Sequence, residues 1–140
     1  MQAQTKSETE NSHSQALAQL ESIKELVAAL KAAEDAEDDD AREEAERAIQ
    51  EDALSIQVRG GWHTPDDEDG DAPEEFTILL CTGGPAVRII GELDEHNQPS
   101  TLHAIHLEHQ DWFTPWTTVA LGIEDKEALV SYARCFYFGE

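Results

Sequence analysis

Two apolar runs joined by a glycine pair, between Glu75 and Gly91, constrain the fold more than any other part of the chain. The runs are residues 76–81 and 86–92, and Thr82-Gly83-Gly84-Pro85 separates them. Short β-rich runs around a glycine pair are typical of a β-hairpin. Glycine adopts positive φ without a steric penalty, and the proline fixes φ where the second run begins. The sequence therefore predicts a hairpin at the centre of a small sheet.

Three further segments are predicted to be strands, and the first of them alternates apolar and polar residues as half-buried strands do. They are residues 54–59, 102–109 and 117–121. A final helix begins near Glu124, because acidic side chains suit the positive end of a helix dipole. Its predicted inner face consists of Ala128, Leu129, Tyr132, Ala133 and Phe136. The sequence predicts an α+β fold: an antiparallel sheet of about four to five strands, a C-terminal helix and an N-terminal helical arm.

The N-terminal third is polar at first and then helical. Residues 1–11 are predicted to be a disordered tail, because they lack the apolar side chains a core needs. Ser12 to Gln15 can cap a helix that runs to about Ala33. The acidic run 34–40 predicts a break, and a second helix begins near Asp40. Residues 12–53 are thus a helical hairpin or one long helix, followed by an α+β domain over 54–140.

One face of the first helix carries an apolar seam with the spacing of a coiled-coil contact. The seam includes Leu20, Ile23, Val27 and Leu30. It can pack on the sheet domain, on the second helix or on a second copy of the chain, and the last case would give a homodimer.

The chain is strongly acidic throughout. It holds 31 Asp and Glu against 9 Lys and Arg, a net charge of −22. Such a surface repels nucleic acid and anionic membranes and attracts basic protein surfaces, including those that normally hold nucleic acid. We predict a basic host protein or nucleoprotein complex as partner, with no direct nucleic-acid or membrane binding. The alternative is that the carboxylates only keep the protein solvated.

The compartment follows from two further features. No apolar run approaches the ~20 residues of a membrane span, and the N-terminus has no hydrophobic signal core. Cys81 and Cys135 are widely spaced in apolar surroundings, which favours reduced cysteines that are buried as small hydrophobic side chains. We expect a cytoplasmic protein of a bacterial host.

Carboxylates concentrate in two places. Residues 34–46 hold nine of them, and the loop 64–74 between two prolines holds the second group. If helical, 34–46 would span roughly 20 Å, over which duplex DNA presents about 12 charges. The predicted partner-binding carboxylates are Asp38, Asp39, Asp40, Glu43, Glu44, Asp66, Asp67, Glu68 and Asp69.

An aromatic bend, Gln110 to Trp116, offers a second kind of contact. Trp112 and Trp116 flank Phe113 and Pro115. Tryptophans in such a bend either pack in the core with their indole N–H groups satisfied, or form a recognition platform. Core packing is the preferred interpretation, and both tryptophans remain candidate contact residues.

Neither a catalytic group nor a metal site is predicted. The acidic loop does not match a calcium-binding template, since Pro65 and Phe76 would occupy ligand positions. His103, His106 and His109 divide between the two faces of a strand, whereas zinc needs converging donors. An apolar strand raises the thiol pKa of Cys81, which disfavours a nucleophile. We predict a protein that is not an enzyme and has no cofactor.

Three segments carry a resemblance to known proteins. They read L-L-C-T-G-G-P-A-V-R-I at 79–89, Q-D-W-F-T-P-W at 110–116 and Y-A-R-C-F-Y-F-G-E at 132–140. They resemble a family of small uncharacterised acidic proteins of phages, plasmids and integrative elements, over roughly residues 50–140. The resemblance does not include the helical arm. It implies a mobile-element setting and assigns no catalytic residue.

Small acidic proteins in that setting often resemble anti-CRISPR or anti-restriction inhibitors, an argument by analogy. The predicted function is a non-enzymatic interaction module that inhibits a host nucleic-acid-binding defence complex by charge mimicry of nucleic acid. The alternative is a homodimeric structural or regulatory accessory protein that uses the leucine seam.

Overall fold

The computed structural model describes residues 2–60, 62, 64–66, 73–82, 85–99, 104–111 and 114–138. The elements, in chain order, are α1 (Gln2–Asp35), α2 (Asp39–Asp52), β1 (Ser55–Gly60), β2 (Pro73–Cys81), β3 (Ala86–Glu92), β4 (His106–Gln110), β5 (Thr117–Thr118) and α3 (Ile123–Ala133). None of the helices in these ranges has both the length and the apolar character needed to cross a membrane.

The five strands form one antiparallel sheet in the order β1-β2-β3-β4-β5. The predicted hairpin is β2–β3, in which Phe76 lies opposite Gly91 and Leu79 opposite Arg88. The predicted α+β fold is thus confirmed. Several strand bounds differ from the prediction. β2 begins at Pro73 rather than 76, β4 begins at His106 rather than 102 and β5 ends at Thr118 rather than 121, while β1 and the end of β4 are shifted by one residue.

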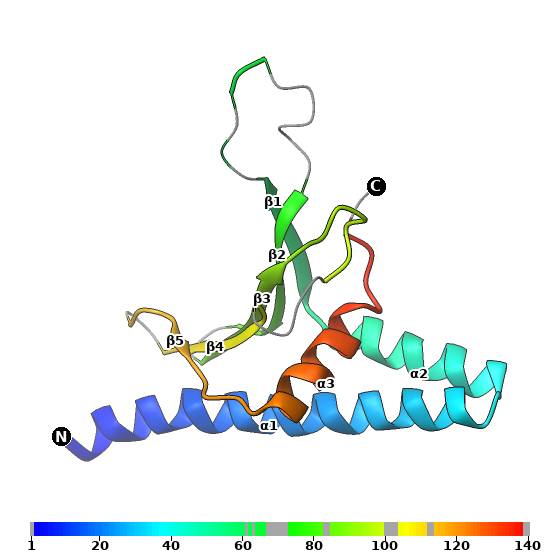
Figure 1. The fold of residues 1–140 in the computed structure, drawn as a ribbon. Helices are drawn as coiled ribbons and strands as arrows, with labels where there is room; N and C mark the ends of the chain where they lie inside the picture. Colours follow the sequence, from blue (N-terminus) through cyan, green and yellow to red (C-terminus); the bar gives the residue numbers. More distant parts are fainter. Residues whose placement is uncertain are drawn as a thin grey trace.

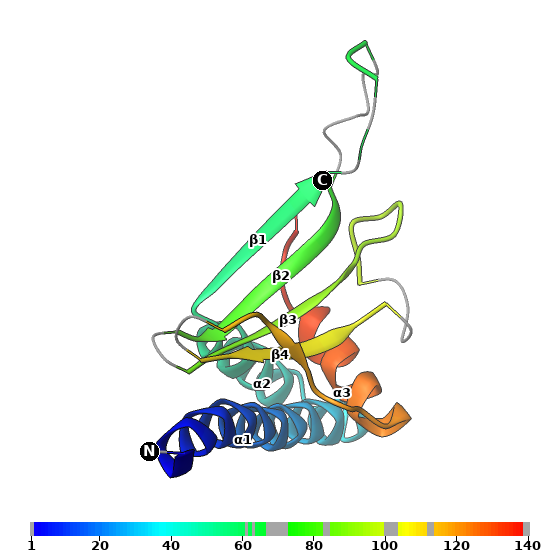
Figure 2. The ribbon, with the colours of Figure 1, turned by 90° about the vertical axis from the view of Figure 1, so that its left-hand side faces the viewer.

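All three helices lie on one side of the sheet, and no described helix covers the other side (Figures 1 and 2). Alternation along the strands decides which side chains face the helices. Phe76, Ile78 and Leu80 of β2 are buried, as are Val87 and Ile89 of β3. Their neighbours in sequence point to the uncovered side, which we call the outer face.

The N-terminal part is a helical hairpin, in which α2 returns along the second half of α1 (Figure 1). The sequence predicts a disordered tail over residues 1–11. In the structure α1 already starts at Gln2, so residues 2–11 are helical instead. The chain has no glycine or proline before Gly60, and nothing in residues 2–11 stops a helix from continuing. Ser12 therefore lies inside α1 and does not cap it.

The helical pair and the sheet share one core. Leu20, Ile23 and Leu30 are buried with Ile49 of α2 and the inner side chains of the sheet, and Val27 packs against them. The seam that the homodimer alternative requires is therefore already covered by the chain itself. A seam dimer would require α1 to leave its own core.

The C-terminal segment packs as predicted. Leu129, Tyr132 and Ala133 of α3 are fully buried. After the helix, Phe136 and Phe138 are buried too. The ring centroids of Phe138 and Phe76 are 4.8 Å apart.

Candidate functional site

The turn between α1 and α2 has the hydrogen bonds of a Schellman motif. The N–H of Glu37 donates to the carbonyl of Glu34 (3.1 Å), and the N–H of Asp38 donates to that of Ala33 (3.1 Å). This motif places one residue in the left-handed region, and here it is Glu37, at φ 55°. Glycine usually holds this position, because a Cβ there is sterically unfavourable.

The second helix begins immediately after this turn. The Asp38 carboxylate accepts a hydrogen bond from the N–H of Ala41 (3.1 Å) and caps α2. The cap is thus Asp38, and α2 begins at Asp39, immediately before the start near Asp40 that the sequence predicts. Asp39 and Asp40 occupy the first turn, where the helix dipole favours negative charge.

We call the nine carboxylates around this turn the acidic tip. They are Glu34, Asp35, Glu37, Asp38, Asp39, Asp40, Glu43, Glu44 and Glu46. All are exposed except the half-buried Glu46, which pairs with Arg42 at 3.4 Å. Within the described ranges, the other eight form no ion pair with a cationic side chain.

The acidic tip lies at the end of the helical hairpin, away from the strands (Figure 1). Because the helix is interrupted at 36–38, the carboxylates gather around a turn. They do not form the straight row of roughly 20 Å that one continuous helix would give.

The second predicted patch is only partly described. Asp66 is exposed, while Asp67, Glu68 and Asp69 lie outside the described residues. Residues 64–66 follow the far end of the β1–β2 pair, opposite to the helices (Figures 1 and 2). The structure does not bring the described part of this patch next to the acidic tip.

The aromatic bend is also partly described, since Trp112 lies outside the described residues. Trp116 is half-buried, and the guanidinium of Arg88 lies 4.0 Å from its ring centroid. Arg88 also donates from Nε to Oε1 of Glu108 (2.8 Å). Trp116 thus packs on a side chain of the outer face and is not part of the hydrophobic core, contrary to the preferred interpretation.

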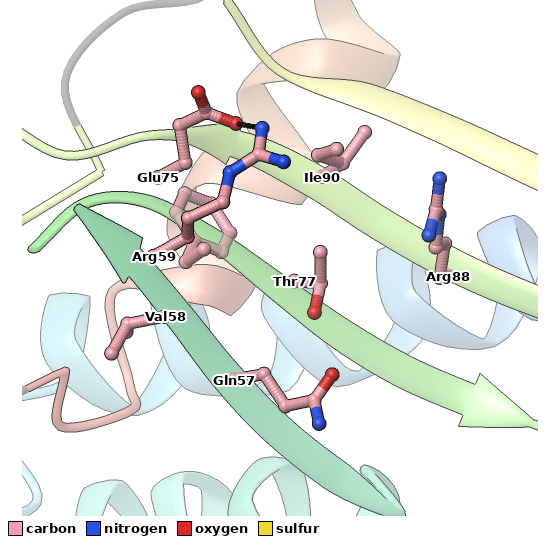
Figure 3. Close-up of a pocket in the computed structure, with 8 residues that line it drawn as sticks. Gln57, Val58, Arg59, Glu75, Thr77, Arg88 and Ile90 are labelled. Atoms are coloured by element: carbon pink, nitrogen blue, oxygen red, sulfur yellow. Dashed lines mark hydrogen bonds and ion pairs between the residues drawn. The ribbon is translucent and has the colours of Figure 1, made fainter. Parts of the chain in front are cut away.

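The outer face of β1, β2 and β3 is concave. It holds a hollow of about 590 Å³. Gln57, Arg59, Thr77, Arg88 and Ile90 are among the residues that line it (Figure 3). Arg59 forms an ion pair with Glu75 at its rim. Sequence reasoning missed this hollow, although strand alternation already places these side chains on one face.

A buried polar cluster joins α1 to β4, and sequence reasoning missed it as well. The Ser12 hydroxyl donates to Oδ2 of Asp111 (2.7 Å), and its oxygen lies 2.8 Å from Nδ1 of His109. Since the hydroxyl proton is directed to Asp111, Nδ1–H of His109 donates to Ser12. The ring of His13 lies edge-on to that of His109, with 5.5 Å between the ring centroids. Burial, with repulsion from His13, lowers the pKa of His109, against the opposing effect of Asp111.

This cluster contains the residue types of a hydrolytic triad without its geometry. In a triad the carboxylate orients the histidine, whereas here Asp111 binds the serine. Ser12 is also only 1% exposed. The cluster therefore acts as a polar contact between helix and sheet.

The two cysteines are half-buried, and their surroundings disfavour the thiolate form. Burial raises the pKa of the Cys81 thiol, and burial together with the charges of Glu46 and Glu34 raises that of Cys135 to about 11. Over the described positions, no three His, Cys, Asp or Glu side chains converge as metal ligands would.

A scan of protein-family models, a search of curated proteins and a search of solved structures each gave no match to this chain.

Proposed function

We propose that this protein is an acidic interaction module whose acidic tip binds a basic, nucleic-acid-binding surface of a partner protein. The eight exposed carboxylates of the tip offer dense negative charge on a scaffold fixed by two helices and a capped turn. Such a surface competes with a phosphate backbone for lysine and arginine side chains.

The observation that carries the proposal is where three of these carboxylates lie. Glu34 and Asp35 occupy the last turn of α1, where the helix dipole disfavours negative charge. Glu37 holds a left-handed backbone conformation that suits glycine. Local structure explains Asp38, Asp39 and Asp40, but it does not explain these three. A role in binding would account for carboxylates at positions where the helix dipole or the backbone conformation disfavours them.

The more specific form of the proposal concerns the partner. We infer inhibition of a host defence complex that holds nucleic acid, of the anti-CRISPR or anti-restriction kind, in the bacterial cytoplasm. The net charge of −22 and the resemblance of three segments to mobile-element proteins support this choice. The free, half-buried thiols fit a reducing compartment.

Capture from bacterial lysate tests the proposal. One variant neutralises Asp38, Asp39, Asp40, Glu43 and Glu44 to Asn or Gln, and asparagine at position 38 preserves the cap. A matched variant neutralises five exposed carboxylates elsewhere. These are Glu21, Glu25, Glu95, Glu124 and Glu127.

Both variants lose the same charge, so a difference between them reports the tip itself. We expect the unaltered protein and the matched variant to retain a basic nucleic-acid-binding protein at low salt, and the tip variant to lose it. Equal capture by all three proteins would contradict the proposal and direct attention to the aromatic bend.

A further inference from the structure

The free edge of the sheet, strand β1, is open to another strand. Among the described strands β1 pairs with β2 alone, so alternate backbone N–H and C=O groups along its other side have no strand partner. Leu54 and Val58 are 58% and 45% exposed, although large apolar side chains are usually covered. The opposite edge, β5, has only two residues.

Edge strands usually carry features that prevent pairing, such as proline, lysine or inward-pointing charge. Residues 55–59 contain none of them. The register irregularity between β1 and β2 comes only at Arg59–Gly60, which leaves the preceding residues regular. Arg59, the one charged residue of the strand, points to the outer face and pairs with Glu75.

The composition of β1 limits what kind of strand could pair with it. In a chain with 31 carboxylates, Ala53 to Pro65 contains none. A basic segment would find no opposite charge on this strand, and a basic partner is therefore not what the edge selects. The pattern of β1 is instead complementary to itself in the antiparallel direction.

We propose that β1 pairs with β1 of a second copy about a two-fold axis at Gln57, which gives a continuous ten-stranded sheet across two copies of the five-stranded one. In this register Ile56 lies opposite Val58 of the other copy, and this apolar pair occurs twice. Ser55 lies opposite Arg59, and the two Gln57 side chains face each other. The proposal does not depend on the proposed function, because the acidic tip is not part of this edge.

The salt dependence separates the two ideas. Two copies of a chain with charge −22 repel each other, so pairing through an apolar edge should become tighter as salt rises. Binding of the acidic tip to a basic partner should become weaker under the same change.

Sedimentation equilibrium of the full chain, at low salt and at high salt, provides the first test. We expect a monomer–dimer equilibrium that shifts toward dimer at high salt. Val58→Lys should weaken it by roughly tenfold or more, since each side chain belongs to one of two symmetric pairs. Leu17→Lys is the control, because Leu17 is similarly exposed (42%) and lies on α1. A monomer at all concentrations, or equal loss in both variants, overturns the proposal.

Cross-linking tests the register. Gln57→Cys should form a disulfide-linked dimer under mild oxidation, while Val58→Cys should not, because Val58 faces Ile56. The native thiols provide a low background, since both are half-buried with raised pKa. Circular dichroism confirms that each variant is folded. A cross-link at position 58 without one at position 57 overturns the proposed pairing.

Discussion

Glu37 holds a backbone conformation that suits glycine better than a residue with a Cβ. Its φ of 55° costs little for glycine and more for a residue with a Cβ. We therefore predict that Glu37→Gly stabilises the protein by about 1 kcal/mol in urea denaturation. Glu37→Gln is the control, because it removes the charge and keeps the Cβ. If both variants have the same free energy of unfolding, backbone strain does not act at this position.

Arg88 and Arg59 provide a comparison of two ion pairs on the same face. The side chains of Arg88 and Glu108 are 26% and 16% exposed, and Trp116 covers the guanidinium. Arg59 is 73% exposed. We predict that Arg88→Ala lowers the free energy of unfolding by about 1–3 kcal/mol, since it leaves Glu108 unpaired and partly buried. Arg59→Ala should cost about 0–1 kcal/mol, the usual range of an exposed pair. Equal losses in chemical denaturation would contradict this account of the outer face.

His109 should make stability depend on pH. Burial lowers its pKa in the folded state, so the folded protein favours the neutral ring. The contribution of His109 to the free energy of unfolding is complete above the pKa of about 6.5 that histidine has in the unfolded chain. This contribution is lost as the pH falls below that value toward the lower pKa of the folded state. We expect the melting temperature of the unaltered protein to fall relative to that of His109→Gln between about pH 7 and pH 5. Parallel curves for the two proteins would exclude this role, because the other titrating groups are common to both.

At the scale of elements, the central hairpin depends on a close contact. Phe76 of β2 lies opposite Gly91 of β3, and a Cβ at position 91 would lie 2.8 Å from two atoms of the Phe76 ring. That ring is fixed against Phe138, so we predict that Gly91→Ala costs about 1–3 kcal/mol of stability through overpacking. Gly122→Ala is the control, since its nearest contact would be 3.8 Å away. A Gly91→Ala variant as stable as the control would show that the ring can move.

The elements were largely predictable because their signals are local. Alternating apolar residues and the Gly-Gly linker predict β2 and β3, and the acidic run 34–40 predicts the break between the helices. The beginning of α1 was not predictable, because residues 1–11 have neither a strong helix signal nor a residue that stops a helix. The contact of Ser12 with His109 joins residues 97 positions apart, and no local pattern reports it.

The same distinction applies to the candidate site. Charge is visible in a sequence, so the acidic tip could be predicted from composition alone. A glutamate in the sequence does not predict a left-handed backbone conformation. Glu37 adopts one because of the two helices that meet there. The outer-face hollow required the register of three strands, which only the structure provides.

At the scale of the whole molecule, the helices cover one face of the sheet and extend the acidic tip away from it (Figure 1). The seam on α1 holds this arrangement together from inside, since Leu20, Ile23 and Leu30 are buried. A partner can therefore reach the acidic tip without disturbing the core. The proposed binding at the tip and the proposed pairing at β1 involve different parts of the surface.

The salt dependence of partner binding tests the central claim most directly. With the captured partner, dissociation constants are measured at several salt concentrations for the unaltered protein, the five-site tip variant and the matched five-site variant. We predict that the tip variant binds at least about tenfold more weakly at low salt and depends less on salt, as expected when charge pairs are lost at the interface. The matched variant should remain close to the unaltered protein. Equal affinities and equal salt dependence for the two variants would contradict a binding role for the acidic tip.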